Sequence, residues 1–377
     1  MVTGSQGVTG SGDKAAAPLA KAPTRTVPER QHPSIFHYPI EACDVSDKVS
    51  LETFREKLQQ WSELFERDPD ASLAGQFADM MWFDIAWRTA NEARQFADDD
   101  GTRGSTAPLI AMMLDRGYLA GQVIAITRLL EKAPANQPKK AVISLPRIVD
   151  EMRAARELIT RENFVCRDAL PYDYEALQAA ELERLSAEMA ANPGKARRVT
   201  LSLSGPDGFD QARMEHELFD QLSGVAPDKR SRGDLIAESF FDRLDELLAS
   251  PPLPEIKALR NKSIAHAADA FSRSQAAGLR AGLTINDLDR AHYLLFAVFQ
   301  TLSVVLFGLS RASPVPVPQH NMFEHLTEPF LAEKRLEAMR GFWDRHIGER
   351  EGWMNDGFHE VLPDPKAVKK APPEGGA

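Results

Sequence analysis

Residues 291–310 read AHYLLFAVFQTLSVVLFGLS, a stretch of twenty residues without a charged side chain, flanked by Arg290 and Arg311. Its length suits a membrane span, and it equally suits the central helix of an all-α bundle, which is apolar on all sides. Four polar residues interrupt the stretch: His292, Gln300, Thr301 and Ser303. Because we find no second span with which these side chains could pair, we expect a buried central helix over residues 284–309 and no membrane contact; a transmembrane segment is the alternative.

The rest of the chain follows the same helical periodicity. Between residues 50 and 347 the apolar residues recur at the spacing of an amphipathic helix, and only residues 199–203 suggest a strand. Ser144 and Thr284 stand where helix N-caps are expected. The pattern predicts an all-α helical bundle with helices at residues 50–68, 72–96, 108–132, 144–164, 172–191, 209–222, 234–249, 254–273, 284–309 and 323–347.

The sequence divides into one domain and two tails. Residues 1–33 are rich in Gly, Ser, Thr, Ala and Pro, and residues 362–377 in Pro, Lys, Gly and Ala, so we expect both tails to be disordered. The helical domain spans residues 50–347. Its extra C-terminal helix, an accessory helix at residues 323–347, carries an apolar stripe that includes Trp343, and we expect this stripe to pack on the bundle or on a partner chain.

Composition and charge limit the classes of function. The 377 residues include 45 Lys and Arg against 55 Asp and Glu, which gives a formal charge of -10 and a pI near 5.5. Nucleic-acid binding by bulk attraction is therefore excluded, and any such binding must be local. Only Cys43 and Cys166 are present, which excludes a disulfide scaffold and suits a cytoplasmic protein. Because neither a glycine-rich phosphate loop nor a convincing metal-ligand spacing is found, we expect no cofactor and no metal.

One segment has a polarity that a surface helix does not explain. Residues 256–266 read IKALRNKSIAH, in which Arg260, Asn261 and His266 are interleaved with apolar residues that should face a core. From Glu255 to Arg280 there are five basic and two acidic side chains, so the local charge is +3. The segment is a basic island in an acidic chain.

This segment resembles the signature of the HEPN superfamily, the higher eukaryote and prokaryote nucleotide-binding domains, and in particular its abortive-infection subgroup. That signature is an arginine, commonly followed by a polar residue, with four to six residues before a histidine. Here five residues separate Arg260 from His266, and Asn261 follows the arginine. The close likeness covers residues 256–272. It implies a helical bundle of HEPN type, with this motif placed just before the final core helix.

The resemblance also implies an activity, a metal-independent endoribonuclease that serves as a toxin or antiviral (abortive infection) effector. His266 would act as acid or base at the ribose 2'-hydroxyl. Arg260 would stabilise charge on the phosphorus oxygens, and Asn261 would orient a phosphate or the histidine. Six residues turn a helix by about 600°, which leaves Arg260 and His266 roughly 120° apart on one helix. We therefore expect a homodimer in which two motifs line one cleft.

The expected partner is RNA, with transfer RNA as one candidate substrate and an antitoxin or regulatory protein as a second partner. Lys257, Lys262 and Arg273 surround the motif and are the expected RNA-binding residues. Because the chain is acidic overall, RNA would meet it at a restricted basic cleft.

Two alternatives stay open from the sequence. In the first the motif is structural: Arg260 pairs with Glu255 or Glu246, and His266 bonds a backbone carbonyl late in its helix. In the second the chain is a catalytically inactive helical module that binds RNA, a nucleotide or a protein partner, with the stripe that includes Trp343 as its interface.

Overall fold

The computed structural model describes residues 33–68, 71–99, 108–132, 142–192, 201–264, 283–319, 321, 323–324 and 333–361. Within these ranges the regular secondary structure is helical, apart from one isolated bridge between Thr160 and Leu235, so the predicted all-α class is confirmed. Residues 201–203 form a loop, and the strand predicted over residues 199–203 is wrong for that part. Residues 1–32 and 362–377, in the predicted tails, lie outside the described residues.

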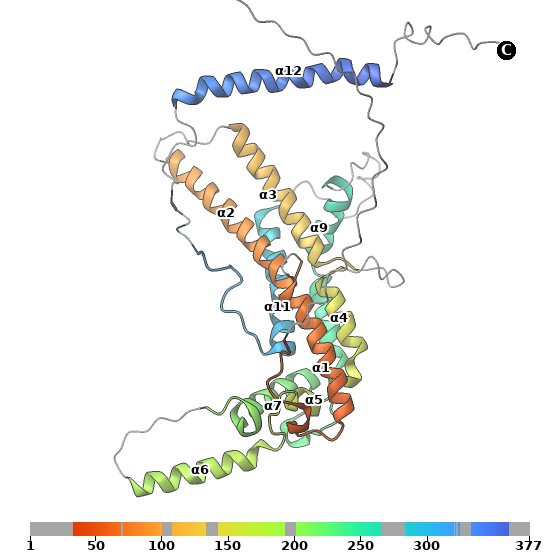
Figure 1. The fold of residues 1–377 in the computed structure, drawn as a ribbon, viewed down its shortest axis with the longest axis vertical. Helices are drawn as coiled ribbons and strands as arrows, with labels where there is room; N and C mark the ends of the chain where they lie inside the picture. The colour runs from red at the N-terminus through yellow and green to blue at the C-terminus, as the bar shows by residue number, and fades with distance from the viewer. Residues whose placement is uncertain are drawn as a thin grey trace, which may run out of the picture.

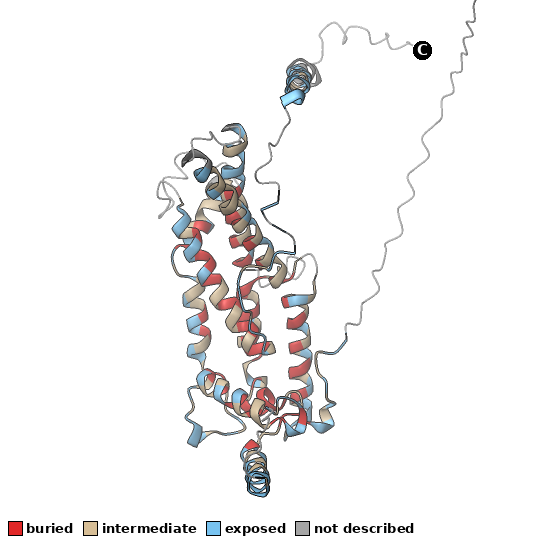
Figure 2. Ribbon diagram, turned by 90° about the vertical axis from the view of Figure 1, so that its left-hand side faces the viewer, coloured by how far each residue is buried: buried red, intermediate tan, exposed pale blue. Residues whose placement is uncertain are grey.

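An elongated bundle of helices forms the body of the protein (Figure 1). Its helices are α1 (Lys48–Ser62), α2 (Leu73–Asp99), α3 (Pro108–Leu129), α4 (Leu145–Ala154), α8 (Glu238–Leu248), α9 (Leu253–Leu259) and α11 (Ile285–Phe307). The remaining α-helices are α5 (Arg161–Cys166), α6 (Tyr174–Ala191), α7 (Phe209–Ser223) and α12 (Leu336–Val361). Shorter 3-10 or π-helical segments are η1 (Ile40–Ala42), η2 (Glu63–Arg67), η4 (Arg156–Leu158), η5 (Gly205–Asp207), η6 (Pro227–Lys229), η7 (Arg260–Ile264) and η8 (Glu333–Arg335). In Figure 2 the buried residues gather where the helices of the body face one another.

Helix α11 is the buried core helix that its sequence predicts. A capping box between Thr284 and Asp287 starts it, and Gly308 ends it in the left-handed region, with φ of 67°. Its polar residue His292 is buried as well. The imidazole Nε2 lies 2.9 Å from Gln122 Oε1 on α3, and burial lowers the pKa of His292, so the neutral ring donates this hydrogen bond.

A second helix, α3, shares the apolar character of α11 and differs from it in burial. Of the described residues, Leu109–Leu129 and Ile285–Phe307 are both long and apolar enough to cross a membrane by length and composition. The expectation of a single such segment is therefore wrong, because Asp115 and Arg116 interrupt the apolar run of α3 without lowering its average hydropathy much. Of the most apolar stretch of each helix, 56% is buried inside the protein for α11 but only 22% for α3.

A polar network joins helices α2, α3 and α11. The Tyr118 hydroxyl donates to Asp84 Oδ1 at 2.6 Å, and Arg88 Nε donates to Asp84 Oδ2 at 2.8 Å. Arg88 also pairs with Asp289 on α11. The ring of Trp87 stacks on Tyr118 with 4.0 Å between centroids. Asp84 is 6% exposed, and these two donors satisfy the hydrogen-bonding capacity of its buried carboxylate.

A buried arginine organises the other end of the body. Arg161 is 0% exposed and donates from Nη1 to Asp220 at 2.7 Å and from Nε to Asp234 at 2.8 Å. Arg230 pairs with the second oxygen of Asp220, also at 2.7 Å. Although burial alone would raise the pKa of Asp220, hydrogen bonds from Arg230 and Arg161 hold it below its ordinary value.

The same contacts explain two helices that are shorter than predicted. The backbone N–H groups of Arg161 and Glu162 donate to the Asp234 and Arg232 carbonyls, which holds the turn at residues 232–233 and the bridge residue Leu235 against the start of α5. The helix predicted at 234–249 therefore begins at Glu238. The helix predicted at 144–164 ends at Ala154, and α5 restarts with the Thr160 side chain as its cap.

The accessory helix also differs from its prediction at residues 323–347. Phe323 and Glu324 form a turn with Asn321. The side-chain oxygen of Asn321 accepts a hydrogen bond from the Phe323 N–H, and the backbone carbonyl of Asn321 accepts one from the Glu324 N–H. Such an Asn turn competes with helix formation, and α12 begins only at Leu336 and continues to Val361. Figures 1 and 2 both place α12 beyond the end of the bundle, so its stripe does not pack on the body of its own chain.

Candidate nucleic-acid interface

The basic segment lies where helix α9 changes into a π-helical turn. Leu253 and Ile256 are buried in the core and anchor α9, which continues as η7 from Arg260 to Ile264. The unbroken α-helix predicted over residues 254–273 is therefore wrong at Arg260. Both α9 and η7 pack against α3. Single π-turns are rare and frequently mark functional positions, because they change the direction in which side chains leave the helix.

The structure describes four of the six predicted site residues. Lys257 and Asn261 are exposed, and Arg260 and Lys262 are half-buried. Arg260 Nη1 lies 3.5 Å from Asn261 Oδ1, at the outer limit of a hydrogen bond, so these two predicted site residues contact each other. His266 and Arg273 lie outside the described residues.

The structural alternative, in which Arg260 pairs with Glu255 or Glu246, is wrong for both carboxylates. Glu246 pairs with Arg243 at 2.9 Å, and the Glu255 Oε2 atom is buried without a hydrogen-bond partner. No described carboxylate forms an ion pair with Arg260, and its guanidinium keeps donors for another acceptor.

One further cation, Lys132, lies beside this segment, and another, Arg128, lies near the end of α3, the helix on which the segment packs. Lys132 follows the end of α3, and together with Lys257 it lines a cavity of about 340 Å³ between α3, α4, α8 and α9. Arg128 precedes Lys132 in the last turn of α3. The apolar part of the cavity comes from Leu130, Pro146, Leu248, Ala249, Leu253 and Pro254.

These cations are distinguished by their lack of carboxylate partners. Arg128, Lys132 and Lys257 form no ion pair in the part of the chain that the structure describes. The carboxylate that shares the cavity, Asp245, is engaged by Arg153 at 2.8 Å. With Arg260 they provide four positive charges for an external anion. These cations are recognised because they form no ion pair with a described carboxylate, and ion pairs cannot be read from a sequence.

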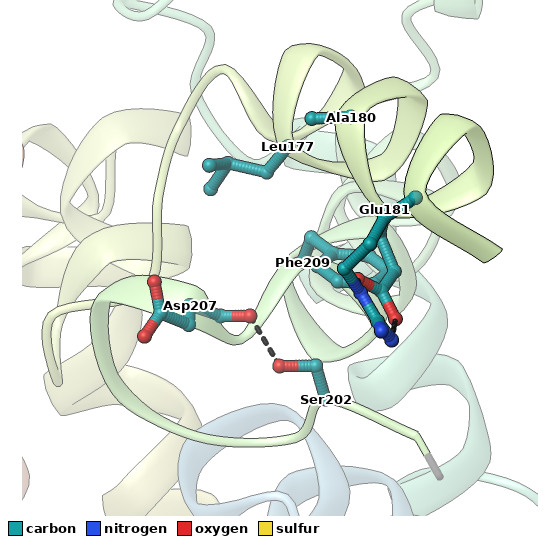
Figure 3. A pocket seen from close by; sticks show the side chains of 7 residues that line it. Leu177, Ala180, Glu181, Ser202, Asp207 and Phe209 are labelled. Atoms are coloured by element: carbon teal, nitrogen blue, oxygen red, sulfur yellow. Dashed lines mark hydrogen bonds and ion pairs between the residues drawn. The ribbon is translucent and has the colours of Figure 1, made fainter. Parts of the chain in front are cut away.

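A second cavity, of about 410 Å³, lies between α6 and the loop at residues 201–209 (Figure 3). Its cation is already neutralised, since Arg184 pairs with Glu181 at 2.6 Å and with Glu188 at 3.2 Å. Figure 3 shows the Ser202 hydroxyl turned to the Asp207 carbonyl, to which it donates. The guanidinium and the hydroxyl of this cavity therefore already have partners within the protein.

A third cavity, of about 430 Å³, contains a histidine and an aspartate. His37 Nδ1 lies 2.9 Å from Asp168 Oδ2, but the imidazole is 83% exposed. The backbone N–H groups of His37 and Tyr38 donate to the other oxygen of Asp168. Asp168 therefore holds the chain before α1 in place, and its role is structural.

Comparison with protein-family models, with curated proteins and with solved structures finds no match to this chain. Among the described residues, no group of three or more His, Cys, Asp or Glu side chains could hold a metal ion. The case for a function therefore rests on the residues of the basic surface formed by Arg128, Lys132, Lys257 and Arg260.

Proposed function

We propose that this protein binds RNA at the basic surface and cleaves it without a metal ion, as a toxin or antiviral effector of HEPN type. The observation that carries the proposal is the group of four cations on α9, η7 and the adjoining end of α3 that form no ion pair with a described carboxylate, in a chain whose net charge is -10. Cations left without carboxylates in an acidic protein are suited to phosphates, which bind guanidinium and ammonium groups strongly.

In the proposed reaction, His266 takes the proton of the ribose 2'-hydroxyl or protonates the leaving 5'-oxygen. The 2'-oxygen attacks the adjacent phosphorus, the bond to the 5'-oxygen breaks, and the products carry a 2',3'-cyclic phosphate and a 5'-hydroxyl. Arg260 stabilises the charge that grows on the phosphorus oxygens, and Asn261 orients the phosphate or His266. Lys257 donates to a neighbouring phosphate. DNA lacks the 2'-hydroxyl and is not cut by this route.

The test uses purified full-length chain with total RNA and with transfer RNA in the presence of a chelator. Wild type should produce new ends with 2',3'-cyclic phosphates, and His266→Ala should abolish them while its thermal unfolding stays unchanged. The matched control is His37→Ala, which removes an exposed histidine from the third cavity and should retain cleavage. Cleavage by His266→Ala at the wild-type rate would refute the assignment of the histidine.

The second candidate function is RNA binding without cleavage. The basic surface favours it independently of His266, because Lys132, Lys257 and Arg260 need no acid or base to hold a phosphate. Under this alternative, wild type and His266→Ala would bind a labelled RNA equally, and neither would cut it. A Lys257→Gln variant would weaken binding in both cases, which separates this outcome from a protein with no RNA affinity.

A further inference from the structure

Helix α3 carries an apolar face that no residue in the described part of the chain covers. Leu109 is 60% exposed, Met113 63% and Ile124 44%, and Gly117 lies exposed between them. These four residues, here called the α3 seam, follow one another at intervals of four, four and seven, which places them on one side of the helix. Contiguous apolar surface of this kind marks an interaction site in a folded protein.

Helix α12 carries a second apolar face that no described residue covers. Leu336, Met339 and Trp343 are 45%, 47% and 56% exposed and are spaced by three and four residues. These three residues, here called the α12 seam, share one side of α12. Figures 1 and 2 both show α12 set apart from the helices of its own bundle. The alternation of three and four residues is the spacing at which helices pair as coiled coils.

We propose that the α12 seam of one copy packs on the α3 seam of a second copy, and reciprocally, so that the chain forms a dimer by exchange of its C-terminal helices. A reciprocal contact covers both seams and closes the assembly at two copies. Gly117 fits this contact, because a Cβ added there would meet nothing within 4 Å, which leaves room for a side chain as large as Trp343.

The exposed area supports a second copy as the occupant. Each seam exposes roughly 400 Å² of side chain, so two reciprocal contacts would bury about 1,600 Å², the size of a standard specific interface. If the α12 seam instead packed on the α3 seam of its own chain, the contact would bury about 800 Å², half of the area of the reciprocal dimer, and α12 would lie against its own bundle. The dimer does not depend on RNA cleavage, so either proposal can fail without the other.

The first test traps the contact with a disulfide. The native thiols Cys43 and Cys166 are buried, so surface cysteines react alone. Chains with Met113→Cys and chains with Trp343→Cys are coexpressed under different tags and oxidised. We expect a covalent pair of twice the chain mass of 41.8 kDa that carries both tags. Covalent dimers of Met113→Cys alone, or a disulfide closed within one doubly substituted chain, would overturn the proposal.

The second test measures association by sedimentation. Met113→Glu should raise the dimer dissociation constant by at least about tenfold, as expected for a central apolar contact. The matched control is Met189→Glu on α6, since Met189 is equally exposed at 63% and lies outside both seams. A wild-type chain that stays monomeric at all concentrations, or that sediments with neutral phospholipid vesicles through Met113, would overturn the exchange.

Discussion

The salt dependence of RNA binding tests the basic surface directly, and Lys257→Gln is the sharpest perturbation. Each phosphate neutralised on a single strand contributes about 0.7 to the slope of log affinity against log salt, so four cations predict a slope of about -2.8. Affinity should then fall about 50-fold between about 50 and 200 mM KCl. Lys257→Gln removes one cation, which brings the slope to about -2.1 and the fall to about 18-fold.

The assay is fluorescence anisotropy of a short labelled single-stranded RNA, measured with His266→Ala so that the probe stays intact. Lys229→Gln is the matched control, because Lys229 is also an exposed lysine but lies in η6, away from α3 and α9. This control should keep the slope of about -2.8. Equal slopes for Lys257→Gln and Lys229→Gln would refute the basic surface as the RNA site.

Three further predictions concern stability. Arg161→Met should lower the free energy of unfolding in urea by about 3–5 kcal/mol, because it leaves Asp234 without its cation and Asp220 with Arg230 alone; a loss below about 1 kcal/mol would contradict this. Tyr118→Phe should cost about 1–3 kcal/mol by removing a donor from buried Asp84, while exposed Tyr293→Phe should cost nothing measurable. Burial lowers the pKa of His216 to about 4, so the folded protein is fully stabilised by the neutral ring above pH 6.5 and loses this stability as the pH falls towards 4. Over that range the free energy of unfolding of wild type should fall by about 3 kcal/mol more than that of His216→Gln.

The sequence predicts those helices whose ends depend on nearby residues. The Thr284 capping box starts α11 as expected, and α7 at Phe209–Ser223 agrees with its prediction to one residue. The prediction from sequence fails where a residue far away in the chain determines where a helix begins or ends. The start of α8 moves to Glu238 because residues 232–235 are held by the backbone of Arg161, about seventy positions earlier in the chain.

The candidate site divides in the same way. The sequence singles out Arg260 and Asn261 as candidates because polar residues among core positions are a local pattern. The sequence does not single out Arg128, because Arg128 resembles Arg153: each lies in the last turn of its helix. Only the fold shows that Arg153 meets Glu238 and Asp245 from α8 while Arg128 meets no carboxylate among the described residues.

An acidic protein can still hold RNA at such a surface, because charge acts over a limited distance. At physiological salt the screening length is about 8 Å, so carboxylates farther away than this repel a bound phosphate only weakly. Around Arg260 and Lys257 the nearer Asp245 is engaged by Arg153. Under the proposed function, the net charge of -10 would slow the approach of RNA and suppress binding elsewhere, while the local contacts would keep their strength. A site of this kind selects RNA that fits it over nucleic acid in general.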